Sequence, residues 1–403
     1  MNRCFNILAK PIGPICNLGC KYCFYLEKEQ LYRHTRNWIM EEPVLETFIK
    51  KYIDTTKDPV VSFVWQGGEP TLLGVDYFRH IVELQKRYAQ EKSIHNSIQT
   101  NGVLLNHEWA DFLKDNNFLV GISLDGPQEI HDYYRRGKGG ESSFDDVMNG
   151  VRILQDYGVE FNTLTTVHHG NEQSPLEVYR FLKRIGSKVI QFIPIVERQA
   201  SNNRWDALSL VSQNFDGKAQ VSDWSVNPQA YGNFLCTIFD EWVRSDVGEV
   251  FIQLFDVTLE MWAGLSSSLC VFQKQCGNAL AMEHNGDLYS CDHYVYPKNF
   301  LGNITDCSLA DAASSLEQLD FSRQKADLPK YCQQCDVRFA CNGECPKHRF
   351  MNTPNGEKGL NYLCAAYRKY FHHVSPYMQF MLMELAQNRA PANVMNWLRG
   401  KKH

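Results

Sequence analysis

Short apolar or alternating runs recur six times between residues 4 and 196, and segments with helical periodicity separate them. The predicted strands cover residues 4–9, 60–65, 94–99, 119–124, 160–167 and 188–196. The predicted helices between them cover residues 43–54, 75–90, 107–115, 143–157 and 176–185. Regular alternation of this kind implies a parallel sheet. Because six units are too few for a closed eight-stranded barrel, we expect an α/β fold, a partial (β/α)6 barrel open enough for a bulky substrate.

The second half of the chain departs from this pattern. Residues 197–228 are rich in Asn, Ser and Gln and predict a loop over the barrel mouth. A helix at 229–244 and an aromatic-rich stretch to residue 262 predict helices that pack on the barrel. We therefore expect a barrel (1–228), a helical connector (229–265), a small cysteine-rich domain (266–370) and a C-terminal helical tail (371–403).

Composition narrows the class of protein. The chain has 403 residues, of which 44% are hydrophobic and 22% charged, and its net charge is −5. These values are ordinary for a globular protein and give no footprint for nucleic acid. Neither an N-terminal apolar run nor an uncharged stretch of about 18 residues is present. We therefore expect a cytoplasmic protein without a membrane span, and we predict a monomer. Disulfides rarely persist in the cytoplasm, so its 14 cysteines indicate cysteine-dependent sites.

Three cysteines near the start, Cys16, Cys20 and Cys23, are one thiolate short of the usual four-cysteine iron–sulfur set. A [4Fe–4S] cube held by three thiolates keeps one iron free to bind a small molecule. A structural zinc site or redox thiols are the alternative, although zinc normally shows a fourth Cys or His within a few residues. No such residue precedes His34 after the triplet.

Other unusual residues follow the next predicted strands, where the chemistry of βα folds gathers. The turn Gly67-Gly68-Glu69-Pro70 comes after Gln66, and Ser123 and Asp125 end the fourth strand. Gly-Gly lets the backbone approach a ligand closely, and Glu69 can accept a bond from an ammonium group. Taken alone, Gly-Gly before Glu-Pro is an ordinary turn, and Ser-x-Asp-Gly an ordinary strand end.

A second cysteine region begins near residue 270. Its eight members are Cys270, Cys276, Cys291, Cys332, Cys335, Cys341, Cys345 and Cys364. Eight thiolates suffice for two fully ligated four-iron clusters, or for two zinc sites. Spacing does not decide which thiolates share a cluster. The remaining Cys4, Cys236 and Cys307 are predicted to be buried thiols.

Asp292 directly follows a cysteine of this region, in Cys-Asp-His-Tyr. A carboxylate at a partly desolvated site beside a cluster ligand is expected to have a raised pKa, which suits a general base. The alternative is that it only accepts backbone N–H bonds in the turn.

Taken together these motifs resemble the radical S-adenosylmethionine (SAM) superfamily, and the second cysteine region resembles its SPASM extension. Over about residues 3–370 the chain resembles one family, the anaerobic sulfatase-maturating enzymes, which convert an active-site Cys or Ser of a sulfatase into Cα-formylglycine. The segments that carry this resemblance are Cys-Asn-Leu-Gly-Cys-Lys-Tyr-Cys-Phe-Tyr, Trp-Gln-Gly-Gly-Glu-Pro-Thr, Gln-Thr-Asn-Gly, Ile-Ser-Leu-Asp-Gly-Pro, Cys-Asp-His-Tyr, Leu-Gly-Asn-Ile and Leu-Asn-Tyr-Leu-Cys.

The resemblance implies SAM and three [4Fe–4S] clusters, one SAM-binding and two auxiliary. The first cluster would use Cys16, Cys20 and Cys23. The auxiliary sets would interleave, as Cys270, Cys276, Cys291 and Cys345 for one and Cys332, Cys335, Cys341 and Cys364 for the other. The implied SAM-site residues are Tyr25, Gln66, Gly67, Gly68, Glu69, Ser123 and Asp125. His293 stands where an apolar residue is expected, a departure that concerns the substrate and not the clusters.

The implied reaction is an oxidation in which a 5′-deoxyadenosyl radical takes a hydrogen atom from Cβ of the target residue. By the resemblance, Asp292 removes the thiol or hydroxyl proton and an auxiliary cluster accepts the electron. The expected partners are an extended sulfatase peptide with a C-x-P-x-R or S-x-P-x-R motif and an electron donor such as flavodoxin or ferredoxin.

Two other functions remain open at this point. One is a SPASM maturase that forms thioether or carbon–carbon crosslinks in another peptide; such enzymes often carry an N-terminal recognition domain, for which Cys16 leaves no room. The other is a zinc-stabilised adaptor without redox chemistry. The sequence does not decide which sulfatase is modified, or whether Cys, Ser or both are accepted.

Overall fold

The computed structural model describes residues 5–200, 208–212, 215, 217–276 and 279–400. Within these residues one ten-stranded sheet dominates the fold, in the order β12-β11-β10-β1-β2-β3-β4-β5-β6-β9. Its first six strands in the chain are β1 (Asn6–Ala9), β2 (Val60–Trp65), β3 (Ser93–Thr100), β4 (Leu119–Ser123), β5 (Phe161–Val167) and β6 (Val189–Pro194). These six strands pair in sequence order and in parallel, which confirms the predicted βα barrel.

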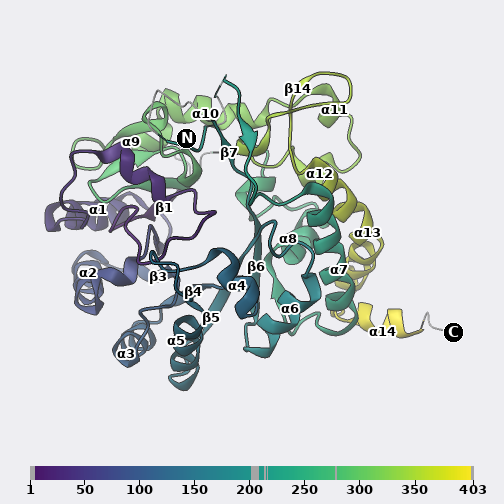
Figure 1. Ribbon diagram of the computed structural model, residues 1–403, viewed down its shortest axis with the longest axis horizontal. Coiled ribbons are helices and arrows are strands. Elements are labelled where there is room, and N and C mark those ends of the chain that lie inside the picture. Colours follow the sequence, from purple (N-terminus) through teal and green to yellow (C-terminus); the bar gives the residue numbers. More distant parts are fainter. Residues whose placement is uncertain (1–4, 201–207, 213–214, 216, 277–278, 401–403) are drawn as a thin grey trace.

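The helices that join these strands lie in an arc outside them (Figure 1). They are α1 (Glu42–Thr55), α2 (Val75–Tyr88), α3 (His107–Asp115), α5 (Phe144–Asp156) and α6 (Pro175–Arg184). Their ends follow the local signals: the Asn106 side chain accepts a bond from Trp109 N at 2.9 Å to begin α3, and Pro175 occupies the first turn of α6. A short helix, α4 (Gln128–Tyr134), follows β4 and was not predicted.

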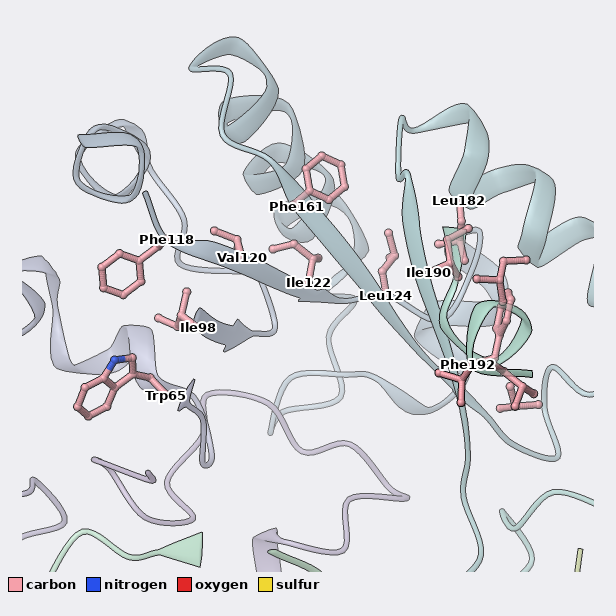
Figure 2. Close-up of a cluster of buried hydrophobic side chains, with 14 of the residues drawn as sticks. Trp65, Ile98, Phe118, Val120, Ile122, Leu124, Phe161, Leu182, Ile190 and Phe192 are labelled. Carbon is pink, nitrogen blue, oxygen red and sulfur yellow. The ribbon is translucent and has the colours of Figure 1, made fainter. Parts of the chain in front are cut away.

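The two faces of the strands differ in burial. On β2, Val61, Phe63 and Trp65 are buried against the helices, while Ser62 on the opposite face is exposed. Figure 2 shows this packed layer continuing through Ile98, Val120 and Ile122. The opposite face of β5 is only partly buried. The interior of the barrel is therefore not filled by side chains, as an open barrel requires.

Sequence analysis missed both ends of the sheet. The strand β9 (Phe251–Ile252) extends it beyond β6, and β10 (Ala279–Met282), β11 (Asp287–Tyr289) and β12 (Phe300–Asn303) extend it beyond β1. β10 pairs in parallel with β1, with Asn6 opposite Ala279 and Ala9 opposite Met282. Strands of two to four residues are too short to show a period of two. The consequence is functional, because β10 runs parallel to β1 and its following turn reaches the same edge of the sheet as the loop after β1.

Helices from the later half complete the fold. They are α7 (Pro228–Ser245), α8 (Gln253–Trp262), α9 (Leu309–Ser314), α10 (Leu316–Ala326), α11 (Lys330–Gln333), α12 (Arg338–Cys341), α13 (Cys364–Ala386) and α14 (Asn393–Gly400). α13 lies along α7 and α8 (Figure 1) and continues across residue 370, where the predicted tail begins. The domain boundaries at residues 228, 265 and 370 stay a prediction. No helix in the described ranges has the length and apolar character needed to cross a membrane.

Two small hairpins lie outside the main sheet. The strands β7 (Arg198–Gln199) and β8 (Gln220–Val221) form one, and β13 (Met351–Asn352) and β14 (Lys358–Leu360) form the other. The first belongs to the predicted mouth loop, of which residues 201–207, 213–214 and 216 lie outside the described residues. Its described part contacts the cysteine loop, because Ser209 N donates to Glu27 at 2.8 Å and Lys21 pairs with Asp223 at 2.8 Å.

The cysteines predicted to be plain buried thiols do not all behave alike. Cys236 is buried on α7, as predicted. Cys307 is only half-buried, so the prediction was wrong there: it lies in a surface turn after β12. Cys4 lies outside the described residues.

Candidate active site

The loop after β1 carries the cysteine triplet. Cys16, Cys20 and Cys23 are each half-buried, and they lie close enough that Cys23 raises the pKa of both others and Cys16 raises that of Cys20. Burial is the larger effect and raises the pKa of Cys16 to about 11 and that of Cys20 to about 12. Thiols are deprotonated outright when they coordinate a metal. Three neighbouring, partly accessible thiols on one loop suit a cluster that keeps one iron open.

The Gly67-Gly68 turn after β2 packs directly on this loop. Gly68 N donates to Gly13 O at 2.8 Å, and Glu69 N donates to Ile15 O at 2.9 Å. A Cβ at residue 68 would lie 2.0 Å from Ile15 O, so only glycine fits. Sequence analysis expected this close approach to serve a ligand. At Gly68 the close approach is to the backbone of the cysteine loop itself.

Glu69 is fully buried and ties three loops together. Its carboxylate accepts bonds from Thr71 N at 3.0 Å, Thr71 Oγ1 at 2.6 Å, Thr100 Oγ1 at 2.7 Å and Asn101 N at 2.6 Å. The Asn101 side chain in turn donates to Asn17 Oδ1 at 2.7 Å, inside the cysteine loop. Burial raises the pKa of Glu69, although the hydrogen bonds from these donors lower it. Oε2 accepts from a single one of these donors, so it keeps a lone pair for one more.

Asp125 is also fully buried, beneath the triplet. Its Oδ2 accepts bonds from Tyr22 Oη at 2.5 Å and Arg135 Nε at 3.1 Å, and its Oδ1 accepts from Thr166 N at 3.0 Å. Burial raises the pKa of Asp125, but the Arg135 guanidinium and His168 outweigh it and hold this pKa well below its usual range. Tyr22 lies between Cys20 and Cys23 in the sequence, so Asp125 supports the triplet from below.

Two further predicted residues lie at the carboxyl ends of β2 and β4. Gln66 is half-buried, and its backbone N donates to Ala9 O at 2.9 Å, which places it beside the start of the cysteine loop. Ser123, at the end of β4, accepts a bond from Gln99 Nε2 at 2.9 Å. Both are partly exposed and face the open interior described above.

A cluster of four side chains forms beside the end of β1, from residues that follow β1, β10 and β11 and from the cysteine loop. Tyr25 Oη donates to the Glu283 carboxylate at 2.6 and 2.7 Å. The Lys10 ammonium lies 3.5 Å from the centre of the Tyr25 ring, 3.7 Å from Glu283 Oε1, and forms an ion pair with Asp292. Lys10 and Glu283 are buried, whereas 26% of the Asp292 side chain is exposed. Sequence analysis named Tyr25 and Asp292 and missed Lys10 and Glu283, because nothing in the sequence indicated that β10 pairs with β1.

The expected pKa of Asp292 was wrong in direction. Burial does raise it, but the Lys10 ammonium outweighs burial and lowers the pKa of Asp292 below its usual value. Glu283 has the opposite balance, since burial outweighs Lys10 and raises its pKa. Asp292 is therefore the ionised carboxylate of this cluster.

His293, next to Asp292 in the sequence, packs as a neutral aromatic ring. Burial lowers the pKa of His293 to about 3, so its imidazole is neutral. Its ring packs edge-on against Phe24, with 5.2 Å between the ring centres. A neutral, packed ring explains how histidine occupies a position where an apolar residue was expected.

The second cysteine region forms two neighbourhoods. In one, burial, then the Glu344 carboxylate and then the charges of Cys291 and Cys276 raise the pKa of Cys345, and Cys270 acts in the same way on Cys276. In the other, a cavity is lined by Cys332, Cys335, Cys341 and Cys364, together with Tyr331, Val337, Arg338, Gly343 and Arg368. Among the described residues, no three His, Cys, Asp or Glu side chains converge on a single metal ion.

Two buried cations hold the loops of these neighbourhoods in place. Arg349 donates to four carbonyl oxygens at 2.8–3.0 Å, those of Gly343, Lys325, Asn342 and Glu344. Lys325 donates to the carbonyls of Cys270 and Val271. These hydrogen bonds satisfy buried backbone carbonyls and hold the loops in shape. The thiols take no part in them. Sequence analysis missed both residues, and a basic side chain among cysteines is too common a pattern to reveal them.

Comparison with known proteins agrees with this geometry. The model of the radical SAM superfamily matches residues 11–182, and that of an iron–sulfur cluster-binding domain, SPASM, matches residues 270–336. The chain is 48% identical over 394 residues to the serine-type anaerobic sulfatase-maturating enzyme of Bacteroides thetaiotaomicron, covering 98% of this chain and 95% of that protein.

More distant relatives give the same result. The cysteine-type anaerobic sulfatase-maturating enzyme of Clostridium perfringens is 32% identical over 378 residues, covering 92% of this chain and 96% of that protein. The solved structure of native anSMEcpe with bound AdoMet and the Cp18Cys peptide superposes with a TM-score of 0.81 at 32% identity, covering 95% of this chain and 99% of that one.

These matches confirm the predicted fold and family and exclude the zinc-stabilised adaptor. The radical SAM model covers the triplet and the Gly-Gly turn, and the SPASM model covers five of the later cysteines. Because both the triplet geometry and the near-complete coverage of a close relative agree, the chain belongs to the anaerobic sulfatase-maturating enzymes, radical SAM enzymes with a SPASM domain.

Proposed function

We propose that this protein oxidises a serine of a sulfatase to Cα-formylglycine, with Asp292 as the general base. The observation that carries the proposal is the Lys10, Tyr25, Glu283 and Asp292 cluster, which presents one partly exposed, ionised carboxylate at the edge of the sheet that also carries the triplet. The serine preference rests on 48% identity to a serine-type relative, against 32% to a cysteine-type one.

The residues present fit the cofactors that the family uses. Cys16, Cys20 and Cys23 would hold the SAM-binding [4Fe–4S] cluster. Tyr25, Gln66, Gly67, Gly68, Glu69, Ser123 and Asp125 would form the SAM site. Of the two acids, Glu69 has a lone pair left on Oε2 for the SAM ammonium, whereas the buried Asp125 acts through Tyr22 and Arg135. When bound, SAM and the cluster supply a 5′-deoxyadenosyl radical that takes one hydrogen atom from Cβ.

The two later thiol sets fit two auxiliary [4Fe–4S] clusters. Cys270, Cys276, Cys291 and Cys345 would form the first, and Cys332, Cys335, Cys341 and Cys364 the second. The shared cavity of the second set and the mutual charge effects of the first support this division. If four thiolates hold each cluster, no iron is free to bind substrate. Both auxiliary clusters would therefore serve electron transfer.

Asp292 does the acid–base chemistry at the target residue. Its ionised carboxylate takes the hydroxyl proton as Cβ loses its hydrogen atom and one electron, which leaves the aldehyde. Lys10 keeps the carboxylate ionised and aimed, because the ammonium is itself fixed by Glu283 and the Tyr25 ring. A cysteine target would give a thioaldehyde that water hydrolyses.

The target peptide would lie extended across the open barrel mouth, with the S-x-P-x-R segment over Asp292. A competition assay tests the serine preference. Equal amounts of S-x-P-x-R and C-x-P-x-R peptides are incubated anaerobically with reconstituted enzyme, SAM and dithionite, and mass spectrometry follows both. The proposal predicts loss of about 2 Da from the serine peptide before loss of about 18 Da from the cysteine peptide. Faster conversion of the cysteine peptide would reject the serine preference, and no conversion of either would reject the function.

A further inference from the structure

A groove opens onto the second auxiliary thiol set from the molecular surface. Pro228 and Gln229 at the start of α7, the β13–β14 hairpin and the first turns of α13 line it. Its residues Tyr331, Cys364 and Arg368 also line the cavity formed by Cys332, Cys335, Cys341 and Cys364. The groove therefore leads directly to these thiols, and all four side chains are half-buried.

The surface around this groove has the opposite charge from the chain as a whole. Residues 330–372 contain seven Lys and Arg and three Asp and Glu, whereas the whole chain carries −5. Glu344 and Arg349 are buried, Lys347 is paired with Glu197, and Glu357 is half-buried. The exposed bases that remain are Lys330, Arg338, Lys358, Arg368 and Lys369. Asp336 is exposed, 3.2 Å from His372 and 3.9 Å from Arg368.

The basic side chains surround the entrance to the thiols. Arg338 and Arg368 line the thiol cavity, and both are exposed. Lys369 and His372, also exposed, line the groove next to them. The Lys369 ammonium has a neutral partner, Asn233 Oδ1, and so keeps its full charge. Positive charge gathered around an accessible path to a redox group favours a negatively charged partner and speeds its association.

We propose that this groove docks an acidic one-electron carrier protein of the flavodoxin or ferredoxin type, which exchanges electrons with the second auxiliary site. The proposal rests on the proposed function, in which each oxidation of a serine releases one hydrogen atom, one proton and one electron. The hydrogen atom goes to 5′-deoxyadenosine and the proton to Asp292. A [4Fe–4S] cluster held by the second thiol set would pass the electron to the docked carrier, which would thereby be reduced by one electron.

The peptide substrate is a poorer occupant of this groove. The S-x-P-x-R segment is itself cationic at its arginine, so the surrounding Arg338, Arg368 and Lys369 repel it. The carboxylate that takes the substrate proton also lies elsewhere, at the end of β11 and beside β1. A weak, transient electron-transfer contact needs only a small interface, for which a shallow groove suffices.

Charge reversal tests the proposal. The double variant R368E/K369E changes two exposed residues of the groove, and K86E/R152E makes the same change of net charge on the outer faces of α2 and α5. Cluster-loaded enzymes are titrated with an acidic flavodoxin by calorimetry at low and high salt, and with the S-x-P-x-R peptide. Iron content is measured for each protein to show that the clusters are intact.

The proposal predicts that R368E/K369E weakens flavodoxin binding at low salt at least about tenfold, while K86E/R152E changes it less than about twofold. Peptide affinity stays the same in both variants. For R368E/K369E the flavodoxin-driven rate also falls relative to the dithionite-driven rate, since dithionite needs no docking. Equal flavodoxin affinity in wild type and R368E/K369E, equal losses in both variants, or a loss of peptide affinity instead would overturn the proposal. Absence of formylglycine in wild type with dithionite would reject the proposed function alone, because flavodoxin affinity is read independently.

Discussion

Lys10, the first residue after β1, forms an ion pair with Asp292, which follows β11. The two residues come from the first and the later half of the chain, and only the parallel pairing of β10 on β1 brings them together. The ammonium is buried and the carboxylate is partly exposed, so the carboxylate stays accessible while its counter-ion does not. This arrangement supports Asp292 as the proposed base and gives Lys10 the proposed role of positioning it.

Replacing Lys10 with methionine removes the charge that orients Asp292. We expect K10M to lower formylglycine formation by roughly tenfold or more, because a general base contributes about 10²–10⁴-fold. Formation of 5′-deoxyadenosine falls much less, so the amount of deoxyadenosine per formylglycine rises. Quantitative chromatography of deoxyadenosine and mass spectrometry of the peptide measure both products.

The matched variant is K10R, which keeps a cation near Glu283 and Asp292 and is expected to restore part of the coupling. Breaking a buried ion pair costs about 3–5 kcal/mol, so thermal unfolding of K10M is compared with wild type. If K10M couples the two products as tightly as wild type does, Lys10 has no role in positioning the base.

The Gly-Gly turn supports the cysteine loop, and G68A tests that role. The new Cβ would lie 2.0 Å from Ile15 O, so the loop that carries the triplet must move. We expect G68A to fail to bind the SAM-site cluster and to lose about one third of the iron of a protein with three clusters. Iron and sulfide assays after anaerobic reconstitution measure the loss.

Gly19 offers a control within the same loop. A Cβ there would meet Lys138 Cα at 3.5 Å, an ordinary contact, so G19A is expected to load normally. Equal iron content in G68A and wild type would show that the close packing on Ile15 is dispensable.

The division of the later cysteines into two sets predicts a pattern of iron loss. C291A and C345A each lose about four of about twelve irons, and the double variant C291A/C345A loses no more, because both belong to one cluster. C291A/C332A loses about eight, because two clusters are affected. A loss of about eight irons from C291A/C345A would show that the two cysteines serve different clusters.

Asp256 on α8 predicts a pH dependence of stability. Burial, with a smaller effect of Glu260, raises the pKa of Asp256 from 3.8 to about 7. The folded state therefore binds this proton more tightly than the unfolded state does. The stabilisation is fully present below about pH 4 and is lost as pH rises to about 7.

The measurement is the free energy of unfolding of wild type relative to D256N, from urea titrations across this range. We expect wild type to lose stability relative to D256N by up to a few kcal/mol between about pH 4 and 7, and the difference to stay constant above that. A difference that does not change with pH would contradict the raised pKa.

How much the sequence could predict depends on the length of each element. The six barrel strands and their helices were predicted within about two residues, because β5 and α2 are long enough to show periods of 2 and 3.6. The strands β10 to β12 have three or four residues each and join the sheet only by pairing, β10 with β1, β11 with β10 and β12 with β11. Their absence from the prediction also hid Lys10 and Glu283.

The candidate site shows the same difference between local sequence patterns, which could be predicted, and long-range contacts, which could not. Cysteine spacing and the Gly-Gly-Glu-Pro turn are local patterns, so the sequence alone located Cys16, Gly68 and Glu69. The direction of the Asp292 pKa was predicted wrongly, because it depends on a lysine that is remote in the chain. The sequence also could not show that Gly68 contacts the Ile15 backbone, since a glycine motif does not reveal what approaches it.

The most direct test of the central claim follows the hydrogen atom itself. An S-x-P-x-R peptide with two deuterium atoms on Cβ of the serine is incubated with reconstituted enzyme, SAM and dithionite. The proposed function predicts a product lighter by about 3 Da and one deuterium in each 5′-deoxyadenosine. Deoxyadenosine without deuterium, beside an unchanged peptide, would contradict it and make another protein substrate the next to test.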